Sequence, residues 1–249
     1  MAAPGSATGH RMALTTTEWI IVMVAVGLGS VTQSALGFGL NVIVAPVAAL
    51  IDPDLVPAPM LVVGTIHLFT LGWAEREHLR LAPVGWVTLG RVPGVVIAVL
   101  LLSSLDRSAI EVLFGVALLS VTAMSLYRRG LPPTRRNLLG AGAVAGVTGT
   151  TVAVGGPPIA LVLAGSDRPR SDITSVLMVG TTLSLLGLFL AGELAWSDVR
   201  IAAALLPAMV VGLAAGRVVA HRLDADRIRV SIYAMAAVAA LVLLVRGLT

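Results

Sequence analysis

Two stretches interrupt an otherwise continuous apolar pattern: Ser34-Ala35-Leu36-Gly37-Phe38-Gly39-Leu40-Asn41, the first break, and Thr150-Thr151-Val152-Ala153-Val154-Gly155-Gly156-Pro157-Pro158, the second break. Each lies inside an apolar run long enough to cross a bilayer. A helix broken by glycine exposes backbone polar groups that lipid cannot satisfy, so such a break persists only where it is buried in protein or lines a cavity. In a duplicated membrane protein, breaks at corresponding positions indicate a solute site.

The composition predicts an all-α integral membrane protein. Hydrophobic residues make up 57% of the chain and charged residues 12%, with a mean hydropathy of +0.96. A soluble domain has roughly 25% charged residues. All 17 basic side chains are arginines, and the net charge is +4. Because the arginines fall in short loops between apolar runs, they indicate membrane orientation rather than binding of nucleic acid.

The chain contains no cysteine, which excludes disulfides and thiolate metal sites. We predict no cofactor and no metal. Residues 1–17 are predicted to form a disordered N-terminal tail. They lack a short apolar core followed by a small-residue cleavage signal, so the first hydrophobic run is predicted to be a retained membrane segment.

Eight apolar stretches follow the tail, at residues 18–51, 55–73, 81–104, 108–126, 138–164, 173–191, 199–220 and 228–245. Most are close to the roughly 20 residues that span the hydrocarbon layer. The first and fifth are longer, and these two contain the breaks. The Arg-rich linker at residues 127–136 divides the chain near its middle.

The two halves of the chain are related in sequence. Leu61-Val62-Val63-Gly64-Thr65 recurs as Leu177-Met178-Val179-Gly180-Thr181, an offset of 116 (180 − 64) that also places Gly39 on Gly155. At an offset of 118, Gly94 falls on Gly212 and Leu105-Asp106 on Leu223-Asp224. We therefore predict two homologous membrane repeats of four hydrophobic segments each, residues 18–130 and 131–249.

The arginines favour one of two topologies. If all eight segments cross the membrane, nine loop and terminal arginines lie on one side and six on the other. If the two broken segments are re-entrant, the division is eleven to four. The second arrangement satisfies the positive-inside rule better and makes the halves inverted repeats, with both termini outside. The eight-span arrangement with both termini inside stays open.

The breaks predict a site for an anion, because unpaired N–H groups and the dipole at a helix start favour negative charge. Pro157 and Pro158 suit the first turn of a new helix, and Asn41 is predicted to cap a similar start in the first break. Gln33, Ser34, Thr150 and Thr151 are predicted to line the site. The alternative interpretation is that the glycines only permit close helix packing.

The ordered motifs resemble the sulfite exporter TauE/SafE family, also called toluenesulfonate uptake permeases, over residues 18–246. The resemblance rests on a Gly-rich break beginning each half, a Gly-Thr in the following helix and a later Gly-xxx-Gly/Ala. Gly39-Leu40-Asn41 departs from the pattern, where further glycines are expected. The resemblance implies transport of small sulfur-containing or organic anions, such as sulfite, sulfonates or sulfoacetate-like compounds, and a bacterial plasma membrane.

Other polar residues inside the segments have two interpretations each. Arg91 either neutralises a bound anion or extends to an interface. His67 is the only central group that titrates near neutral pH, and it serves either proton coupling or packing. Thr65 and Thr181 either face the cavity or bond a carbonyl one turn back. Gly94-xxx-Ala98 and Gly212-xxx-Gly216 are predicted to mark close helix crossings.

We therefore predict a multi-pass secondary transporter of the inner membrane that moves a small anion by alternating access, coupled to a proton or cation or to neither. A channel-like facilitator is the main alternative and a membrane-embedded enzyme a remote one; a purely structural role leaves the paired breaks unexplained. Oligomeric state stays open. The predicted substrate-binding residues are Gln33, Ser34, Gly37, Gly39, Asn41, Thr65, Arg91, Thr150, Thr151, Gly155, Gly156, Pro157 and Thr181.

Overall fold

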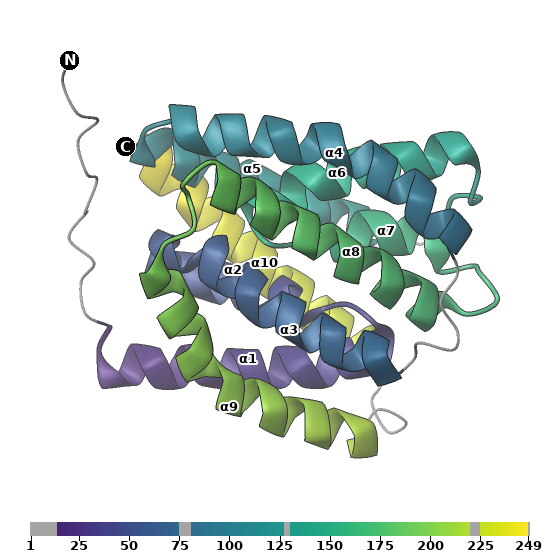
Figure 1. The fold of residues 1–249 in the computed structure, drawn as a ribbon. Helices are drawn as coiled ribbons and strands as arrows, with labels where there is room; N and C mark the ends of the chain where they lie inside the picture. The colour runs from purple at the N-terminus through teal and green to yellow at the C-terminus, as the bar shows by residue number, and fades with distance from the viewer. Residues whose placement is uncertain (1–13, 75–80, 127–129, 220–224, 249) are drawn as a thin grey trace.

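A computed structural model describes residues 14–74, 81–126, 130–219 and 225–248, with backbone alone at 81–82, 219 and 225–233. Throughout these residues the fold is helical (Figure 1). The elements are α1 (Thr16–Leu36), α2 (Leu40–Ile51), the 3-10 turn η1 (Pro53–Leu55), α3 (Ala58–Ala74), α4 (Leu81–Ser104), α5 (Arg107–Leu126), α6 (Arg135–Thr151), α7 (Gly156–Leu163), α8 (Pro169–Leu190), α9 (Trp196–Val219) and α10 (Ala225–Leu248).

The first membrane helix starts earlier than the sequence pattern indicated. Thr15 and Glu18 form a reciprocal capping box, in which the Thr15 side chain accepts from the Glu18 N–H and the Glu18 carboxylate accepts from Thr15. Helix α1 therefore begins at Thr16, inside the segment predicted as a tail. Residues 1–13 of that predicted tail lie outside the described residues.

Both broken segments fold back on themselves. A Cβ atom added at Gly29 would lie 2.7 Å from the Leu40 carbonyl oxygen, although eleven residues of continuous helix cover about 16 Å. In the second half, a Cβ at Gly155 would lie 3.2 Å from the carbonyl oxygen of Ala145. Gly37 and Gly39 make the first reversal with φ angles of +81° and +130°, which favour glycine. The chain thus reverses direction within each break.

Helices that follow one another run in alternating directions, so the loops gather at two ends of the molecule (Figure 1). At one end Arg107 pairs with Asp52 and Arg246 donates to the Leu50 carbonyl, and we call this the Arg246 end. Helices α6 and α8 begin at the opposite end, which we call the Arg168 end after the N-cap residue of α8. The ends of the molecule therefore carry the loop charges, and the helices between them are apolar.

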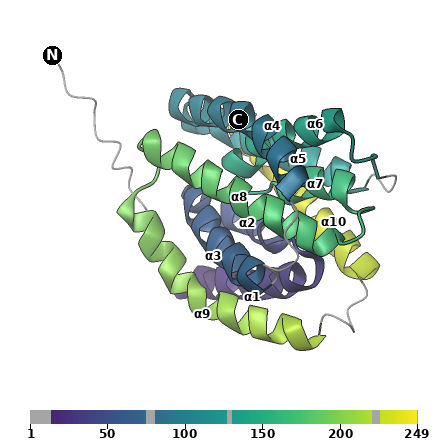
Figure 2. The same cartoon turned by 45° about the vertical axis from the view of Figure 1, so that its right-hand side comes forward.

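The helices pack in pairs that join the two halves. Helix α4 packs against α6, and α9 packs against α1; α5 packs against α10, and α3 against α8. Further contacts join α4 with α8, α9 with α3, α2 with α10 and α7 with α5. In Figure 2 the short helices α2 and α7 lie within the bundle formed by the long helices. The halves are therefore interleaved rather than separate bodies.

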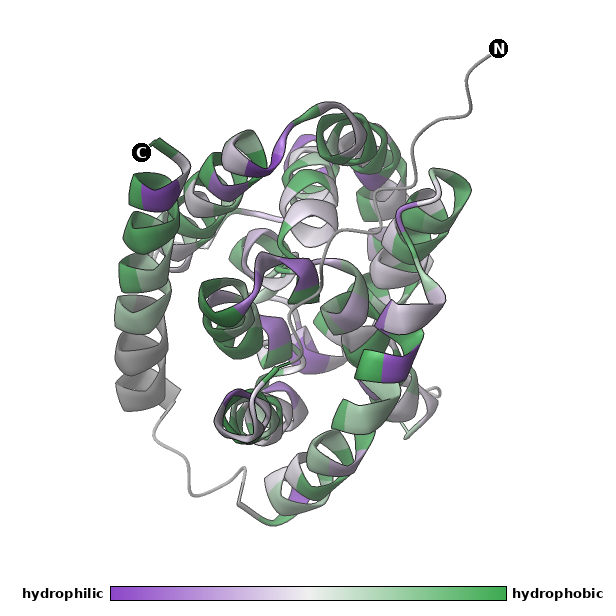
Figure 3. Ribbon diagram, turned by 90° about the vertical axis from the view of Figure 1, so that its left-hand side faces the viewer, coloured by the Kyte–Doolittle hydropathy of each residue, from purple (hydrophilic) through white to green (hydrophobic). Residues whose placement is uncertain are grey.

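Six helices in the described residues are long and apolar enough to cross a membrane: Thr16–Leu36, Pro53–Ala74, Pro83–Ser104, Arg107–Leu126, Pro169–Leu190 and Trp196–Val218. Their outward faces are apolar: Leu100, Leu190 and Val211 are 59%, 75% and 69% exposed. Viewed from the Arg246 end, hydrophobic residues dominate the periphery and more hydrophilic ones lie towards the middle (Figure 3). Such faces are stable against lipid and not against water. The chain is a multi-pass membrane protein.

The predicted close crossings are confirmed. At Gly94 an added Cβ would meet Ala143 and Gly146 of α6, and at Gly212 it would meet Gly27 and Ser30 of α1. Glycine at these positions lets the backbones approach closely, which is how membrane helices associate without a hydrophobic driving force. These two crossings fix α6 and α1, the helices that lead into the breaks.

Candidate functional site

The two breaks contact each other inside the bundle. A Cβ atom at Gly156, the first residue of α7, would lie 2.8–3.1 Å from the Cδ2, Cβ and Cγ atoms of Phe38. Phe38 belongs to the first break and is 6% exposed. The absence of a side chain at Gly156 therefore allows one break to pack directly on the other.

A small cavity lies where the breaks meet, with a volume of about 30 Å³. This is room for one or two water molecules. Six of the predicted site residues line it: Gln33, Gly39, Asn41, Gly155, Gly156 and Thr181. The rest of the lining is mainly apolar: Phe38, Val42, Gly64, Leu68, Ala153, Val154 and Leu177. The cavity thus combines both breaks with the following helices, α3 and α8.

Gln33 joins the first break to α3. Its Oε1 accepts the Leu40 N–H at 3.1 Å, which fixes the orientation of the amide, and its Nε2 lies 3.1 Å from Nδ1 of His67. Because an amide nitrogen only donates, Nδ1 accepts and the imidazole carries its proton on Nε2. His67 is fully buried. Its role in proton coupling stays a prediction.

The prediction that Asn41 caps the second helix of the first break was wrong. Gly39 is the N-cap residue and makes no side-chain cap bond. The Asn41 amide instead donates to the Met60 carbonyl at 3.2 Å, beside Gly64 of α3. Asn41 is the second residue of the helix, two positions past the N-cap, so its side chain does not reach back to the free N–H groups.

The helix starts offer fewer free N–H groups than the simple pattern implies. In α2, the Leu40 N–H is already bound by Gln33. In α7, which begins at Gly156 as the prolines predicted, the next two residues are Pro157 and Pro158 and have no N–H. A negative guest at the second break would therefore need a donor from elsewhere.

Arg91 supplies a positive charge next to the second break. Its side chain is fully buried, at 0% exposure, so the alternative in which it extends to an interface does not hold. A Cβ atom at Gly155 would lie 3.2 Å from Nη1, and one at Gly149 would lie 2.6 Å from Nη2. The guanidinium therefore stands directly behind the cavity wall that Gly155 forms.

One hydroxyl group binds one side of the guanidinium, and a second hydroxyl group supports the first. Nη2 of Arg91 donates to Ser184 Oγ at 3.2 Å, and Thr150 Oγ1 donates to the same oxygen at 2.8 Å. On the other side, a Cβ at Gly180 would lie 2.5, 2.7 and 2.8 Å from Nη1, Cζ and Nε. We call Gly149, Gly155 and Gly180 the glycine slot, because a side chain at any of them would contact the guanidinium.

Five further predicted residues do not line the cavity: Ser34, Gly37, Thr65, Thr151 and Pro157. Ser34 Oγ donates to the Ser30 carbonyl, and Thr151 Oγ1 donates to the Val147 carbonyl. Gly37 packs against Arg170 at the start of α8, and Pro157 is buried in α7. Of the repeated threonines, Thr181 lines the cavity while donating to the Met178 carbonyl at 3.3 Å, and Thr65 is buried but does not line it.

Sequence reasoning missed Phe38, Gly149 and Ser184. Ser184 lies four residues after Gly180 on α8, so it shares a helix face with a glycine that the repeat had singled out. That spacing was an available signal. For Phe38 and Gly149 the only signal was their position in or next to a break.

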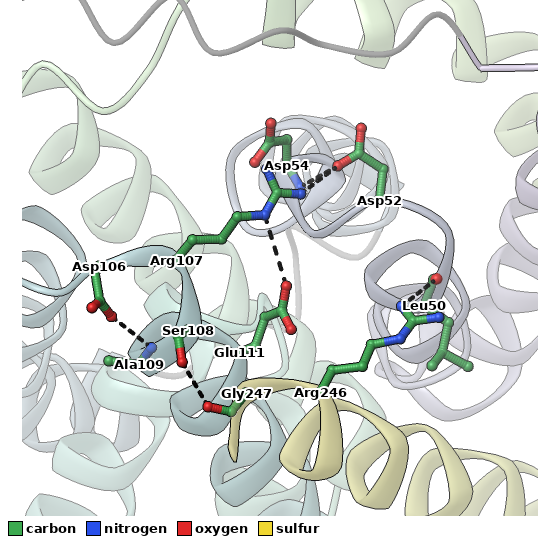
Figure 4. Close-up of polar contacts among 10 residues, drawn as sticks. All are labelled: Leu50, Asp52, Asp54, Asp106, Arg107, Ser108, Ala109, Glu111, Arg246 and Gly247. Carbon is green, nitrogen blue, oxygen red and sulfur yellow. Dashed lines mark hydrogen bonds and ion pairs between the residues drawn. The ribbon is translucent and has the colours of Figure 1, made fainter. Parts of the chain in front are cut away.

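A second, larger cavity of about 440 Å³ opens at the Arg246 end, lined by Asp54, Arg107, Phe114, Glu193 and Asp198 among others. Beside it, Arg107 forms ion pairs with Asp52 at 3.8 Å and Glu111 at 3.7 Å. Arg246 donates to the Leu50 carbonyl, and Ser108 donates to the Gly247 carbonyl (Figure 4). These contacts tie the end of α2 to α5 and α10.

The fold and this buried site define a polytopic helical membrane protein with a polar centre between two broken helices. A family model described as sulfite exporter TauE/SafE matches residues 21–243. The chain belongs to the TauE/SafE sulfite exporter family, which confirms the resemblance seen in its motifs. No curated protein and no solved structure matches the chain. Family membership implies a membrane transporter of the sulfite or anion exporter type.

Proposed function

We propose that the protein is a secondary transporter that carries a small anion across a bacterial plasma membrane by alternating access, with the anion held between the two breaks. The observation that carries this proposal is the direct contact of the breaks, Phe38 on Gly156. Beside this contact lies a cavity lined in part by the polar side chains of Gln33, Asn41 and Thr181. Broken helices at membrane depth are where secondary transporters place their substrates.

The helix pairing supports inverted repeats. Helices α1 to α5 correspond in order to α6 to α10. Under this correspondence the α4–α6 pair becomes the α9–α1 pair, and the α5–α10 and α3–α8 pairs each become themselves. Helices α1 and α6 also run in opposite directions (Figure 1). Re-entrant breaks place Arg200 and Arg246 opposite Arg136. Cysteines at positions 136 and 200 that react from one side of the membrane would contradict this arrangement.

The size of the cavity favours a transporter over a channel-like facilitator. At about 30 Å³ it has no room for a sulfonate or a sulfite ion with its hydration shell. Binding therefore requires the walls to separate, which couples substrate binding to movement of the helices. A channel needs no such coupling, because its path stays open to both sides.

The test is flux in proteoliposomes that contain the purified protein. We expect uptake of labelled sulfite or a small sulfonate to saturate with concentration and to accelerate when the same anion is loaded on the opposite side. Imposed gradients of protons or sodium ions then identify the coupling ion. Flux that rises linearly without exchange favours the facilitator, and flux equal to empty vesicles for all small anions contradicts the proposal.

A further inference from the structure

The buried guanidinium of Arg91 is unusual in its surroundings. Nε and Nη1 have no hydrogen-bond partner, and within the described part of the chain no carboxylate forms an ion pair with this side chain. Removing a charge from water without a counter-charge is costly, and membrane proteins retain such residues where they serve function. The missing negative charge is therefore expected to come from a bound anion.

This anion can reach the guanidinium at the second break. Residues 152–155 are not helical, and Gly155 separates Nη1 from the cavity. Only backbone fills this separation, since Gly149 and Gly155 have no side chains. A small displacement of the second break would expose Nη1 to the cavity and break one backbone hydrogen bond, from the Val154 N–H to the Thr148 carbonyl. A similar displacement of a helix would break several internal hydrogen bonds.

The chemistry on the two sides of the cavity is unequal. On the side of the second break lies the guanidinium of Arg91, from α4 of the first half, with the Ser184 and Thr150 hydroxyls of the second half. On the side of the first break lie the amides of Gln33 and Asn41. Guanidinium groups bind carboxylates and similar planar oxygen pairs through parallel N–H donors, which a spherical halide cannot use. A single cation balances a single negative charge.

We propose that Arg91 binds the charged group of the transported anion at the second break, and that this group is a monovalent oxoanion with at least two oxygen atoms. The inference rests on the proposed function. It adds which residue binds the anion, on which side of the cavity the anion binds, and what charge the anion carries. Ser184 and Thr150 are positioning residues, because they orient the guanidinium. The amides of the first half contact the uncharged part of the guest.

The test compares Arg91→Gln and Arg91→Met with the matched control Arg200→Gln, which changes an exposed arginine of α9. The probes are methanesulfonate, its neutral analogue methanesulfonamide, and chloride. We expect the wild type and the control to bind methanesulfonate and to discriminate against chloride. In the Arg91 variants, methanesulfonate affinity falls on the order of a hundredfold, while methanesulfonamide affinity changes less than about threefold.

Stability measurements separate binding from structure. Without any anion, Arg91→Met should melt no lower than the wild type, because it removes an uncompensated buried charge. Equal losses of both sulfur probes together with a lower melting temperature would show a structural role and overturn the inference. Unchanged methanesulfonate affinity in Arg91→Gln also overturns the inference about Arg91, but it does not contradict the proposed transport function. A wild type that moves no anion in proteoliposomes instead defeats the proposed function itself.

Discussion

Replacing Gly156 with leucine is expected to reduce anion flux to the level of empty vesicles. The new side chain would occupy the space of the Phe38 ring, whose atoms already lie 2.8–3.1 Å from a Cβ at this position. The ring has only the cavity to move into, because Phe38 is otherwise buried. The breaks then separate and the cavity fills. Membrane insertion should be unaffected, since the substitution adds an apolar group to an apolar segment.

Gly140→Leu is the matched control for this variant. Gly140 lies on α6, in the same broken segment, and a Cβ there meets no atom within 4 Å. Flux per inserted molecule should match the wild type in Gly140→Leu and vanish in Gly156→Leu. Measurable saturable flux in Gly156→Leu at normal expression would show that transport does not pass between the breaks.

Replacing Gly180 with valine is expected to have the second largest effect. Its Cβ would lie 2.5 Å from Nη1 of Arg91, and the guanidinium has Gly149 on its other side. The buried charge can therefore only move by displacing backbone. Overpacking of this kind costs about 1–3 kcal/mol, and we expect thermal stability to fall and oxoanion flux to drop at least tenfold.

A double substitution identifies the cause of the Gly180→Val effect. If the collision is with Arg91, the stability loss should be smaller in an Arg91→Ala background, because the two residues share one contact. Gly85→Val is the control, since Gly85 lies on the same helix as Arg91 and an added Cβ there meets nothing within 4 Å. Additive stability losses in the double variant would show that Gly180→Val acts through a contact other than the one with Arg91.

The breaks and the glycine crossings could be predicted from the sequence because each depends on local chemistry. Glycine and proline within an apolar run change the backbone wherever the run is placed, so residues 37–39 and 152–155 were identifiable. Gly94 and Gly212 were identifiable because small residues one turn apart mark close contacts. The family also followed from the order of these motifs.

The detailed site could not be predicted in the same way, because it depends on which helices become neighbours. Arg91 lies about ten residues into its segment, and its depth alone did not distinguish a buried guanidinium from an interfacial one. The answer came from the packing of α4 on α6 and α8, where three glycines leave room for it. Asn41 was misassigned for a related reason: the Met60 carbonyl that binds it comes from α3.

Protection of a single thiol in the cavity tests the central claim most directly. The chain has no cysteine, so Val154→Cys introduces one reactive group in the lining between the breaks. Ala195→Cys, in the larger cavity at the Arg246 end, is the control. We predict that a transported anion slows modification of Cys at position 154 by neutral methyl methanethiosulfonate and leaves position 195 unchanged. Equal rates at position 154 with and without saturating anion would contradict binding between the two breaks.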